Sequence, residues 1–393
     1  MPNKIKLSIP QGMRDWLPGE AYRKRDLINK LLKQISLWGY EEINTPMLEY
    51  YQVLLPDENW GGAEQIYKLV ERDGRILALR SEMTLPIARV VSSKLPAAYP
   101  WRLMYGGEVF RYEEIQTGRQ REFSQVGVEL IGAAGEAADS EIVALAIETL
   151  RAAGLDSFTV SLGHTGVLRG LLESLSWEDA QLDRVRALIL EKDFVSLGSY
   201  LLSAGMKEKR IQHLVGFLTC QLSPNDLVKE GRDLPQGILE ALADLQKIIS
   251  FLKRYGYERY VQVDLSTLRS QEYYTGMVFE IYTPGIGYPI GGGGRYDQLL
   301  HNWGTACPAT GFALGVERIL LSLPQEEKAK KEKPLLLVGT DAGKVISKAL
   351  QLRKEGKRVF TEIGELSRWE AEKLALSKGA VLSWCGGENA DEA

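Results

Sequence analysis

The chain has 393 residues, which predicts two or three domains because a single hydrophobic core rarely grows so large. Its 45% hydrophobic and 25% charged residues are typical of a soluble globular protein, and a net charge of −4 argues against a surface built to grip nucleic acid. No apolar run approaches membrane-spanning length, and the N-terminus lacks the apolar core of a signal peptide. The scattered cysteines and histidines indicate a reducing cytoplasm and argue against disulfides and metal sites.

Apolar periodicity predicts alternating helices and strands in the N-terminal part of the chain. Helices are expected at residues 20–38, 83–93 and 139–153. Strands are expected at 40–46, in a hairpin over 65–80, and in a strand–loop–strand unit over 103–132. The hairpin rests on Arg72-Asp73-Gly74, a turn signal between two apolar runs.

From about residue 166 to 255 the chain is rich in Leu, Glu, Lys and Ala at helical spacing, which predicts a helical insertion. Strand patterns return at 260–265, 278–282 and 288–290, and a helix is expected to start around Arg295. Because the strands of the main body follow one another directly, they favour an antiparallel sheet.

The C-terminal part of the chain changes character at residues 324–333, a charged segment poor in apolar residues that is typical of a linker. Behind it, residues 334–393 predict a small βαβαβ unit. Its strands are expected at 335–339, 358–363 and 380–384, and its helices at 344–355 and 367–378. The predicted organisation is therefore an α+β core over 1–323, the linker, and a small α/β domain.

The strand–loop–strand unit places charged and amide side chains where the flanking apolar residues imply burial. Arg111 closes the first strand, and Gln125 and Glu129 share one face of the second because strand side chains alternate. A buried charge needs a partner, which is either an internal Arg111–Glu129 salt bridge or a ligand that carries both signs. Gln125 on the same face as Glu129 favours a pocket for such a ligand.

Three further segments combine an apolar framework with polar groups. Glu82 and Thr84 lie where a strand ends and a helix begins, and on that segment alone helix capping is the favoured interpretation. Tyr273 and Tyr274 precede a strand, as core anchors or as hydroxyl groups for a polar ligand. The glycine run 291–294 permits close approach of a ligand to the backbone, or forms a flexible turn. No nucleotide fingerprint or catalytic nucleophile accompanies these segments, so no catalytic residue or cofactor is predicted.

Taken in order, six segments resemble the core of class II aminoacyl-tRNA synthetases and, within that class, the histidyl-tRNA synthetase branch. The resemblance covers nearly all of residues 5–323 apart from the helical insertion. It implies a class II antiparallel sheet flanked by helices, and a dimer formed through the segment like motif 1. The segments are Ile9–Asp15, Ile43–Glu49 (like motif 1), Phe110–Glu113 with the loop and strand that follow (like motif 2), Leu268–Glu280, Gly292–Asp297 and Gly311–Arg318 (like motif 3).

Carried over position by position, the resemblance implies a histidine-binding pocket. Glu82, Thr84 and Gln125 would meet the α-ammonium group, and Glu129 and Tyr274 would meet the imidazole ring. Arg111 and Arg269 fall where the synthetase contacts the carboxylate and phosphate of the adenylate, and Arg318 falls where motif 3 meets ATP. The predicted histidine-binding residues are Glu82, Thr84, Arg111, Gln125, Glu129, Arg269, Tyr273 and Tyr274.

The chain departs from the synthetase pattern at several positions. After the motif 2 glutamate the synthetase continues with Arg and Pro, where this chain has Glu114 and Ile115. The synthetase's Arg-Pro-Glu-Gly-Thr is Arg80-Ser81-Glu82-Met83-Thr84 here. The segment 334–393 is also shorter than the anticodon-binding domain, for which about 100 residues are expected. The groups for histidine are kept, and those for ATP and tRNA are weakened.

This combination resembles the regulatory subunits of ATP phosphoribosyltransferase, a family paralogous to histidyl-tRNA synthetase. The resemblance implies a non-catalytic cytoplasmic protein that joins the short-form catalytic subunit in a hetero-oligomer, with L-histidine as the feedback effector of the first step of histidine biosynthesis. Binding of tRNA, a membrane, a metal or a cofactor is not expected. The alternative is a histidyl-tRNA synthetase with a reduced anticodon-binding domain, which Arg111, Arg269 and Arg318 keep open.

Overall fold

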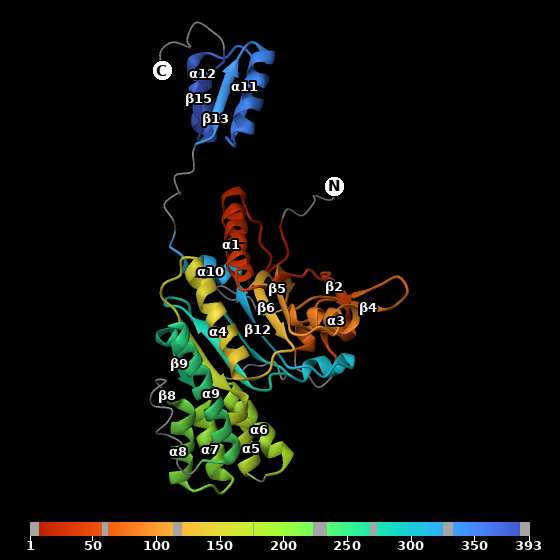
Figure 1. Ribbon diagram of the computed structural model, residues 1–393, viewed down its shortest axis with the longest axis vertical. Helices are drawn as coiled ribbons and strands as arrows, with labels where there is room; N and C mark the ends of the chain where they lie inside the picture. Colours follow the sequence, from red (N-terminus) through yellow and green to blue (C-terminus); the bar gives the residue numbers. More distant parts are fainter. Residues whose placement is uncertain are drawn as a thin grey trace, which may run out of the picture. The chain divides into compact units, whose positions relative to one another are not determined.

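The computed structural model describes residues 8–56, 62–112, 120–175, 177–222, 234–267, 273–324 and 333–385 (Figure 1). The chain divides into two compact units, Met1–Leu323 and Pro324–Ala393. No helix in these described ranges has both the length and the apolar character that crossing a membrane requires.

A nine-stranded sheet forms the centre of the first unit. Neighbouring strands from β5 to β7 in the order below are antiparallel, as predicted, but β1 pairs with β5 and β7 pairs with β9 in parallel, so the sheet is mixed. Within each of these two pairs, a long stretch of chain connects the first strand to the second, which parallel pairing requires. The order is β1 (Glu41–Glu42), β5 (Trp101–Phe110), β6 (Glu122–Ile131), β12 (Ala309–Gly315), β11 (Gly291–Arg295), β10 (Met277–Tyr282), β7 (Thr159–His164), β9 (Val261–Asp264) and β8 (Gln221–Leu222).

Helices from distant parts of the chain cover one face of this sheet (Figure 1). They are α1 (Pro18–Ser36), α4 (Gly135–Ala152), α9 (Gln236–Tyr255) and α10 (Val316–Ser322). In its described part, residues 166–175, 177–222 and 234–255, the predicted insertion is helical apart from connecting turns and the short strand β8, and its remaining helices gather beside α9 (Figure 1). These are α5 (Thr165–Leu175), α6 (Asp179–Leu190), α7 (Phe194–Ser203) and α8 (Glu208–Thr219).

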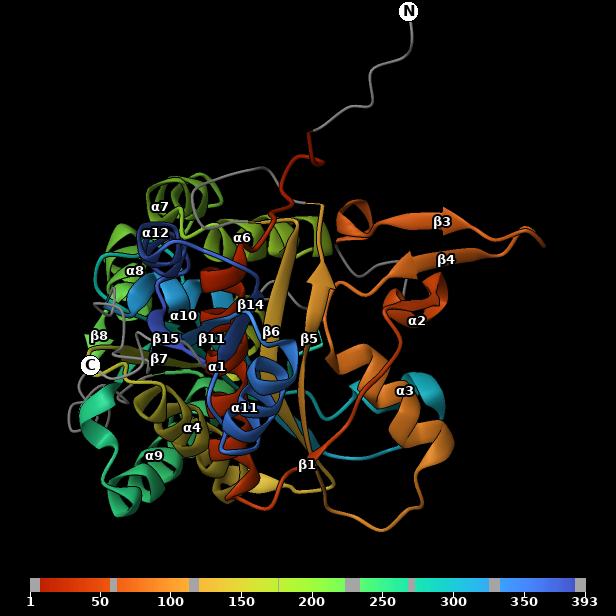
Figure 2. The same ribbon diagram turned by 90° about the horizontal axis from the view of Figure 1, so that it is seen from above.

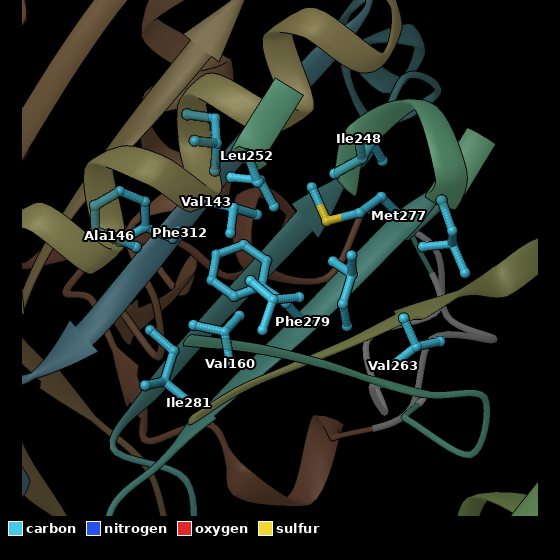
Figure 3. Packing of buried hydrophobic residues seen from close by; sticks show 14 of the residues in the cluster. Val143, Ala146, Val160, Ile248, Leu252, Val263, Met277, Phe279, Ile281 and Phe312 are labelled. Atoms are coloured by element: carbon cyan, nitrogen blue, oxygen red, sulfur yellow. The ribbon is translucent and has the colours of Figure 1, made fainter. Parts of the chain in front are cut away.

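The main hydrophobic core lies between these helices and the sheet (Figure 3). Val143 of α4 and Leu252 of α9 pack with Phe279 of β10, and all three side chains are fully buried. On β6, the fully buried Val126, Val128 and Leu130 join the same core. Since strand side chains alternate, the odd-numbered residues of β6 face the opposite side of the sheet. Core packing on one face therefore fixes which side chains of β6 remain for a site on the other.

Fewer elements cover the opposite face. Helix α3 (Thr84–Lys94) packs against the 3₁₀ helix η3 (Leu299–Trp303), and both contribute to a second core. Beside α3 and the short helix α2 (Tyr51–Leu54) lies a small antiparallel sheet that extends away from the large one (Figure 2). The small sheet has the order β2 (Leu48–Tyr50), β4 (Ile76–Leu79) and β3 (Lys68–Val70). Its β3–β4 hairpin confirms the predicted turn, in which Gly74 has a positive φ of 86°.

The glycine run is itself a strand, which the sequence did not predict. Gly291–Arg295 forms β11 in the middle of the sheet, and in place of the helix expected from around Arg295 only the 3₁₀ helix η3 follows, from Leu299. A Cβ atom on Gly293 would lie 2.0 Å from the backbone oxygen of Gly311, so the ladder requires glycine there. Strand β7 was also missed, and β1 is only two residues long where a strand over 40–46 was expected.

Arg295 closes β11 and ties it to the start of α4. Its guanidinium lies 2.8 Å from a carboxylate oxygen of Asp139 and 2.8 Å from one of Asp297. The Arg295 and Asp139 side chains are only 8% and 6% exposed, whereas Asp297 is 39% exposed. Arg295 also donates to the carbonyl oxygens of Ala133 and Gly135. A buried ion pair of this kind holds the residue that follows, Tyr296, in place.

The second unit is a small three-stranded parallel sheet with the predicted βαβαβ order of elements. Helix α11 packs on one face through Val345 and Ala349, and α12 packs on the other through Ala371 and Ala375. The elements are β13 (Leu335–Gly339), α11 (Ala342–Lys354), β14 (Val359–Ile363), α12 (Arg368–Lys378) and β15 (Val381–Trp384).

Candidate functional site

A cavity of about 380 Å³, a volume that includes its open mouth, lies on the sheet face opposite α1 and α4. Seven of the eight predicted binding residues line it, and the eighth, Arg269, lies outside the described residues. The seven are Glu82, Thr84, Arg111, Gln125, Glu129, Tyr273 and Tyr274.

The floor of the cavity is backbone. The strand register places Gly127, Ala313 and Gly292 in one cross-strand row. Glu129, Gly311 and Gly294 form the next row. A Cβ atom on Gly127 would lie 2.2 Å from the carbonyl oxygen of Phe312 and 2.4 Å from the hydroxyl oxygen of Tyr105, so this position requires glycine. Gly292 and Gly311 line the cavity, so a ligand would contact backbone there.

Glu129 lies at the centre of the cavity and is only 1% exposed. Its two carboxylate oxygens accept hydrogen bonds from hydroxyl groups: Thr84 Oγ1 donates at 2.8 Å, and the Tyr296 hydroxyl donates to the other oxygen. Arg111 instead donates from Nε to the carbonyl oxygen of Ser81 at 2.8 Å. The alternative of an internal Arg111–Glu129 salt bridge is therefore wrong, because these two described side chains form no ion pair.

Glu82 combines both roles that its sequence context suggested. Its Oε1 accepts a hydrogen bond from the backbone N–H of Leu85 at 2.7 Å, which satisfies a free donor in the first turn of α3. Its Oε2 accepts one from the hydroxyl of Tyr273 at 3.2 Å, within the cavity. Thr84 does not cap the helix, because its hydroxyl is directed to Glu129.

Burial raises the pKa of both carboxyl groups. For Glu129 burial outweighs the hydrogen bonds from Tyr296 and Thr84, and the nearby charge of Glu82 adds to it, so its pKa rises to about 8. For Glu82 burial also raises the pKa, while the Leu85 N–H and the charge of Arg111 act in the opposite direction. A cationic group placed in the cavity would favour the ionised form of both.

Gln125 brings an acceptor to the same cavity. Its side chain is 9% exposed, and its Oε1 atom has no hydrogen-bond partner among the described residues. A buried amide oxygen without a partner costs free energy, which a donor on a bound ligand would recover.

Sequence reasoning missed two tyrosines that line the cavity, Tyr105 and Tyr296. Tyr105 lies directly across the β5–β6 ladder from Gly127, and a tyrosine opposite a glycine is a signal that could have been used once the register was known. Tyr296 lies in the segment Gly292–Asp297 that resembles the histidyl-tRNA synthetase branch, which is a signal that could have been used, but its partner Glu129 is 167 residues away in the sequence.

Arg318 does not line the cavity. Its guanidinium donates to the carbonyl oxygen of Pro289 at 2.6 Å and lies 4.9 Å from the ring centre of Tyr288. Glu114 and Ile115, which depart from the synthetase pattern, lie outside the described residues.

The histidyl-tRNA synthetase family matches residues 12–319 of the chain. The solved histidyl-tRNA synthetase from Nostoc sp. PCC 7120 has the same fold, with a TM-score of 0.79 at 22% identity over 96% of this chain and 90% of that one. A structure from Bacillus halodurans C, described as an ATP phosphoribosyltransferase regulatory subunit/histidyl-tRNA synthetase, has a TM-score of 0.86 at 32% identity, covering 98% and 99%. The fold is therefore that of the histidyl-tRNA synthetase-like class.

Curated relatives narrow the assignment from this class to one family. The ATP phosphoribosyltransferase regulatory subunit of Moorella thermoacetica is 40% identical over 389 residues, which cover 98% of this chain and all of the relative. The protein of the same name from Halothermothrix orenii is 37% identical, covering 96% and 92%. The chain belongs to the family of ATP phosphoribosyltransferase regulatory subunits.

Proposed function

We propose that the chain is a non-catalytic cytoplasmic subunit that joins a short-form catalytic ATP phosphoribosyltransferase and is needed for the first step of L-histidine biosynthesis. Histidine bound in the cavity mediates feedback inhibition. The observation that carries this proposal is the set of groups around one cavity: the buried carboxyl of Glu129, the half-buried carboxyl of Glu82, the open amide oxygen of Gln125 and the guanidinium of Arg111. Such a set complements a small zwitterion with a hydrogen-bonding ring.

Each part of histidine then has a matching group. Its α-ammonium group meets Glu82, Thr84 and Gln125, and its carboxylate meets Arg111. Its ring meets Glu129 and Tyr274. By linkage, if histidine changes the state of the assembled enzyme, the catalytic partner must change the affinity for histidine by the same factor.

Mixing the purified chain with a short-form catalytic subunit tests the proposal. The chain is expected to bind histidine by calorimetry, to form a hetero-oligomer and to raise the activity of its partner, and histidine is expected to inhibit the assembled enzyme. If the chain neither binds histidine nor associates with the catalytic subunit, the proposal is lost.

A histidyl-tRNA synthetase with a reduced C-terminal domain is the second candidate. The position of Arg111 in the cavity favours it, because a guanidinium there could also stabilise an adenylate. The engagement of Arg318 with Pro289 and Tyr288, away from the cavity, speaks against it. Histidine-dependent exchange between ATP and pyrophosphate separates the two: we expect background rates, and robust exchange with tRNA charging would replace the regulatory proposal.

The proposal includes a homodimer formed through the segment that resembles motif 1. Strand β2 carries part of this segment into the small sheet, where Leu48, Tyr50 and Leu69 are 44%, 42% and 44% exposed. The ladder places Tyr50 and Leu69 opposite the same residue, Leu77, so they share one face with Leu48. An apolar sheet face of this kind suits a two-fold contact with a second copy.

Changing Leu48 to aspartate is expected to raise the dimer dissociation constant by at least about tenfold, because a buried unpaired charge would enter the interface. Sedimentation velocity at several concentrations measures it. The matched control is Val195→Asp on α7, a side chain that is 82% exposed in another part of the first unit. Equal effects of the two changes, or no effect of Leu48→Asp, would contradict a dimer contact through this sheet face.

A further inference from the structure

Glu129 has hydroxyl partners but no cationic partner among the described residues. Thr84 and Tyr296 donate to its two oxygens, and its side chain is almost completely buried. An ionised carboxylate in such a place costs several kcal/mol unless a charge of opposite sign pairs with it. The carboxyl of Glu82 shares the cavity and adds to this cost when it is ionised.

The charged and titratable groups that the structure describes around Glu129 do not supply that charge. Arg111 is the cation of the described cavity lining, and its charge acts on Glu82, while its Nε donates to Ser81. On the helix side of the sheet, Tyr40 feels the charge of Glu129, but it donates its own hydrogen bond to Glu141, which pairs with Arg102. Among the lining residues that the structure describes, the remaining titratable groups are tyrosines, namely Tyr105, Tyr273, Tyr274 and Tyr296.

We propose that Glu129 carries a proton in the empty cavity and donates it, as a hydrogen bond, to the unprotonated nitrogen of a neutral imidazole ring. This inference rests on the proposed function, because it specifies the protonation form in which histidine is bound. The Glu129–imidazole pair holds one proton in total, whichever partner carries it. No net charge is then buried at this end of the cavity.

Tyr296 is the positioning residue of this arrangement. Its hydroxyl donates to one oxygen of Glu129 and Thr84 donates to the other, so the plane of the carboxyl group is fixed before a ligand arrives. The ring of Tyr296 packs edge-on against Tyr273, with 5.8 Å between ring centres, and Tyr273 in turn donates to Glu82. Two packed tyrosines therefore hold the two carboxyl groups that face the ligand.

The inference fixes how many protons move when histidine binds. A free imidazole ring has a pKa of about 6.5. The pKa of Glu129 is raised by burial to about 8. At a pH between these two values, Glu129 of the empty protein is protonated and the free imidazole ring is neutral. Together they already hold one proton, so binding exchanges no proton with the solvent. Below this pH window the free imidazole ring is protonated, so one proton must leave when histidine binds. Above it Glu129 is ionised, so one proton must be taken up. The affinity for histidine therefore falls on both sides of the window by up to about tenfold per pH unit.

Calorimetry in paired buffers of different ionisation enthalpy counts these protons. The unaltered protein is expected to exchange about none near pH 7 and, near pH 9, to take up about one proton in addition to the proton taken up by the α-amino group of histidine. Glu129→Gln has no carboxyl to titrate, so its uptake near pH 9 should be smaller by about one proton. The α-ammonium group of histidine titrates equally in both proteins, and the difference between them removes its contribution.

The Tyr296→Phe variant tests whether the hydroxyl of Tyr296 positions Glu129 or whether Tyr296 only supports the fold. Loss of the donated hydrogen bond should lower the affinity for histidine at neutral pH by about tenfold. The same hydrogen bond stabilises the ionised form of Glu129, so its loss should raise the pKa of Glu129. The pH at which proton uptake begins should therefore move upward. A purely structural role of Tyr296 would change the affinity at every pH equally and leave the onset in place.

Two results would overturn the inference in distinguishable ways. Histidine binding with uptake of about one proton near pH 7, absent in Glu129→Gln, would show that the empty cavity holds an ionised Glu129. That outcome leaves the proposed function intact. A lack of histidine binding at any pH, in protein whose circular dichroism shows it folded, would remove the proposed function together with the inference.

Discussion

Replacing Glu129 by alanine is expected to weaken histidine binding by about 10- to 100-fold, because losing a buried hydrogen-bond partner of the ring costs roughly 1–3 kcal/mol. Under the proposed function the same change relieves feedback inhibition and leaves the hetero-oligomer intact, since Glu129 is buried inside one subunit. Calorimetry measures the affinity, and inhibition curves of the assembled enzyme measure the feedback.

The matched control is Glu122→Ala, on the same strand β6 but outside the cavity lining. It should leave histidine affinity within about twofold, as expected for a surface change of a few tenths of a kcal/mol. If Glu129→Ala abolishes assembly as well as binding, Glu129 has a structural role and the assignment of the ring contact fails.

The same variant has a signature in stability against pH. Because the pKa of Glu129 rises from 4.5 to about 8 on folding, the folded chain binds more protons than the unfolded chain within that window. The free energy of unfolding therefore falls as pH increases from 4.5 to about 8. Glu129→Ala lacks this contribution, so urea denaturation at several pH values should give a flatter profile than the unaltered protein.

Replacing Arg295 by methionine is expected to lower the free energy of unfolding by about 3–5 kcal/mol, the cost of leaving a buried partner charge uncompensated. The partner is Asp139, whose side chain is 6% exposed in the core beneath α4. The loss should also weaken histidine binding, because Tyr296 follows Arg295 directly and holds Glu129. Urea denaturation of the first unit measures the stability change.

Two further variants test the cause. Removing the other charge as well, in Arg295→Met with Asp139→Leu, should recover most of the lost stability, since apolar replacements of buried ion pairs are often neutral. Asp297→Ala removes the more exposed partner and should cost below about 1 kcal/mol, because solvent screens it. If the double variant is no more stable than Arg295→Met, the hydrogen bonds to Ala133 and Gly135 carry the effect.

Much of the cavity could be anticipated because strand geometry is regular. Gln125 and Glu129 share a face whatever their neighbours are, and the alternation with buried valines identified that face before any partner strand was known. The register of the hairpin was not available from the pattern. In the ladder Glu129 lies opposite Leu103, whereas Arg111 lies opposite Arg121, which is why the salt bridge between the two charges does not form.

Strand β11 and the role of Tyr296 in the cavity were not predicted from the sequence. A glycine run has low strand propensity, and pairing with β10 on one side and β12 on the other makes β11 a strand. Tyr296 became a cavity residue through a contact between distant parts of the chain, to which local patterns are blind. Both failures are cases of tertiary structure deciding what local preference leaves open.

The glycine floor of the cavity restricts how its selectivity can change. A methyl group at Gly311 would lie 2.1 Å from a carboxylate oxygen of Glu129 and 2.4 Å from the carbonyl oxygen of Val128, so this position cannot gain a side chain without moving Glu129 or the sheet. Adaptation to another ligand, in evolution or in design, is therefore easier through the side chains that line the cavity than through this part of its floor.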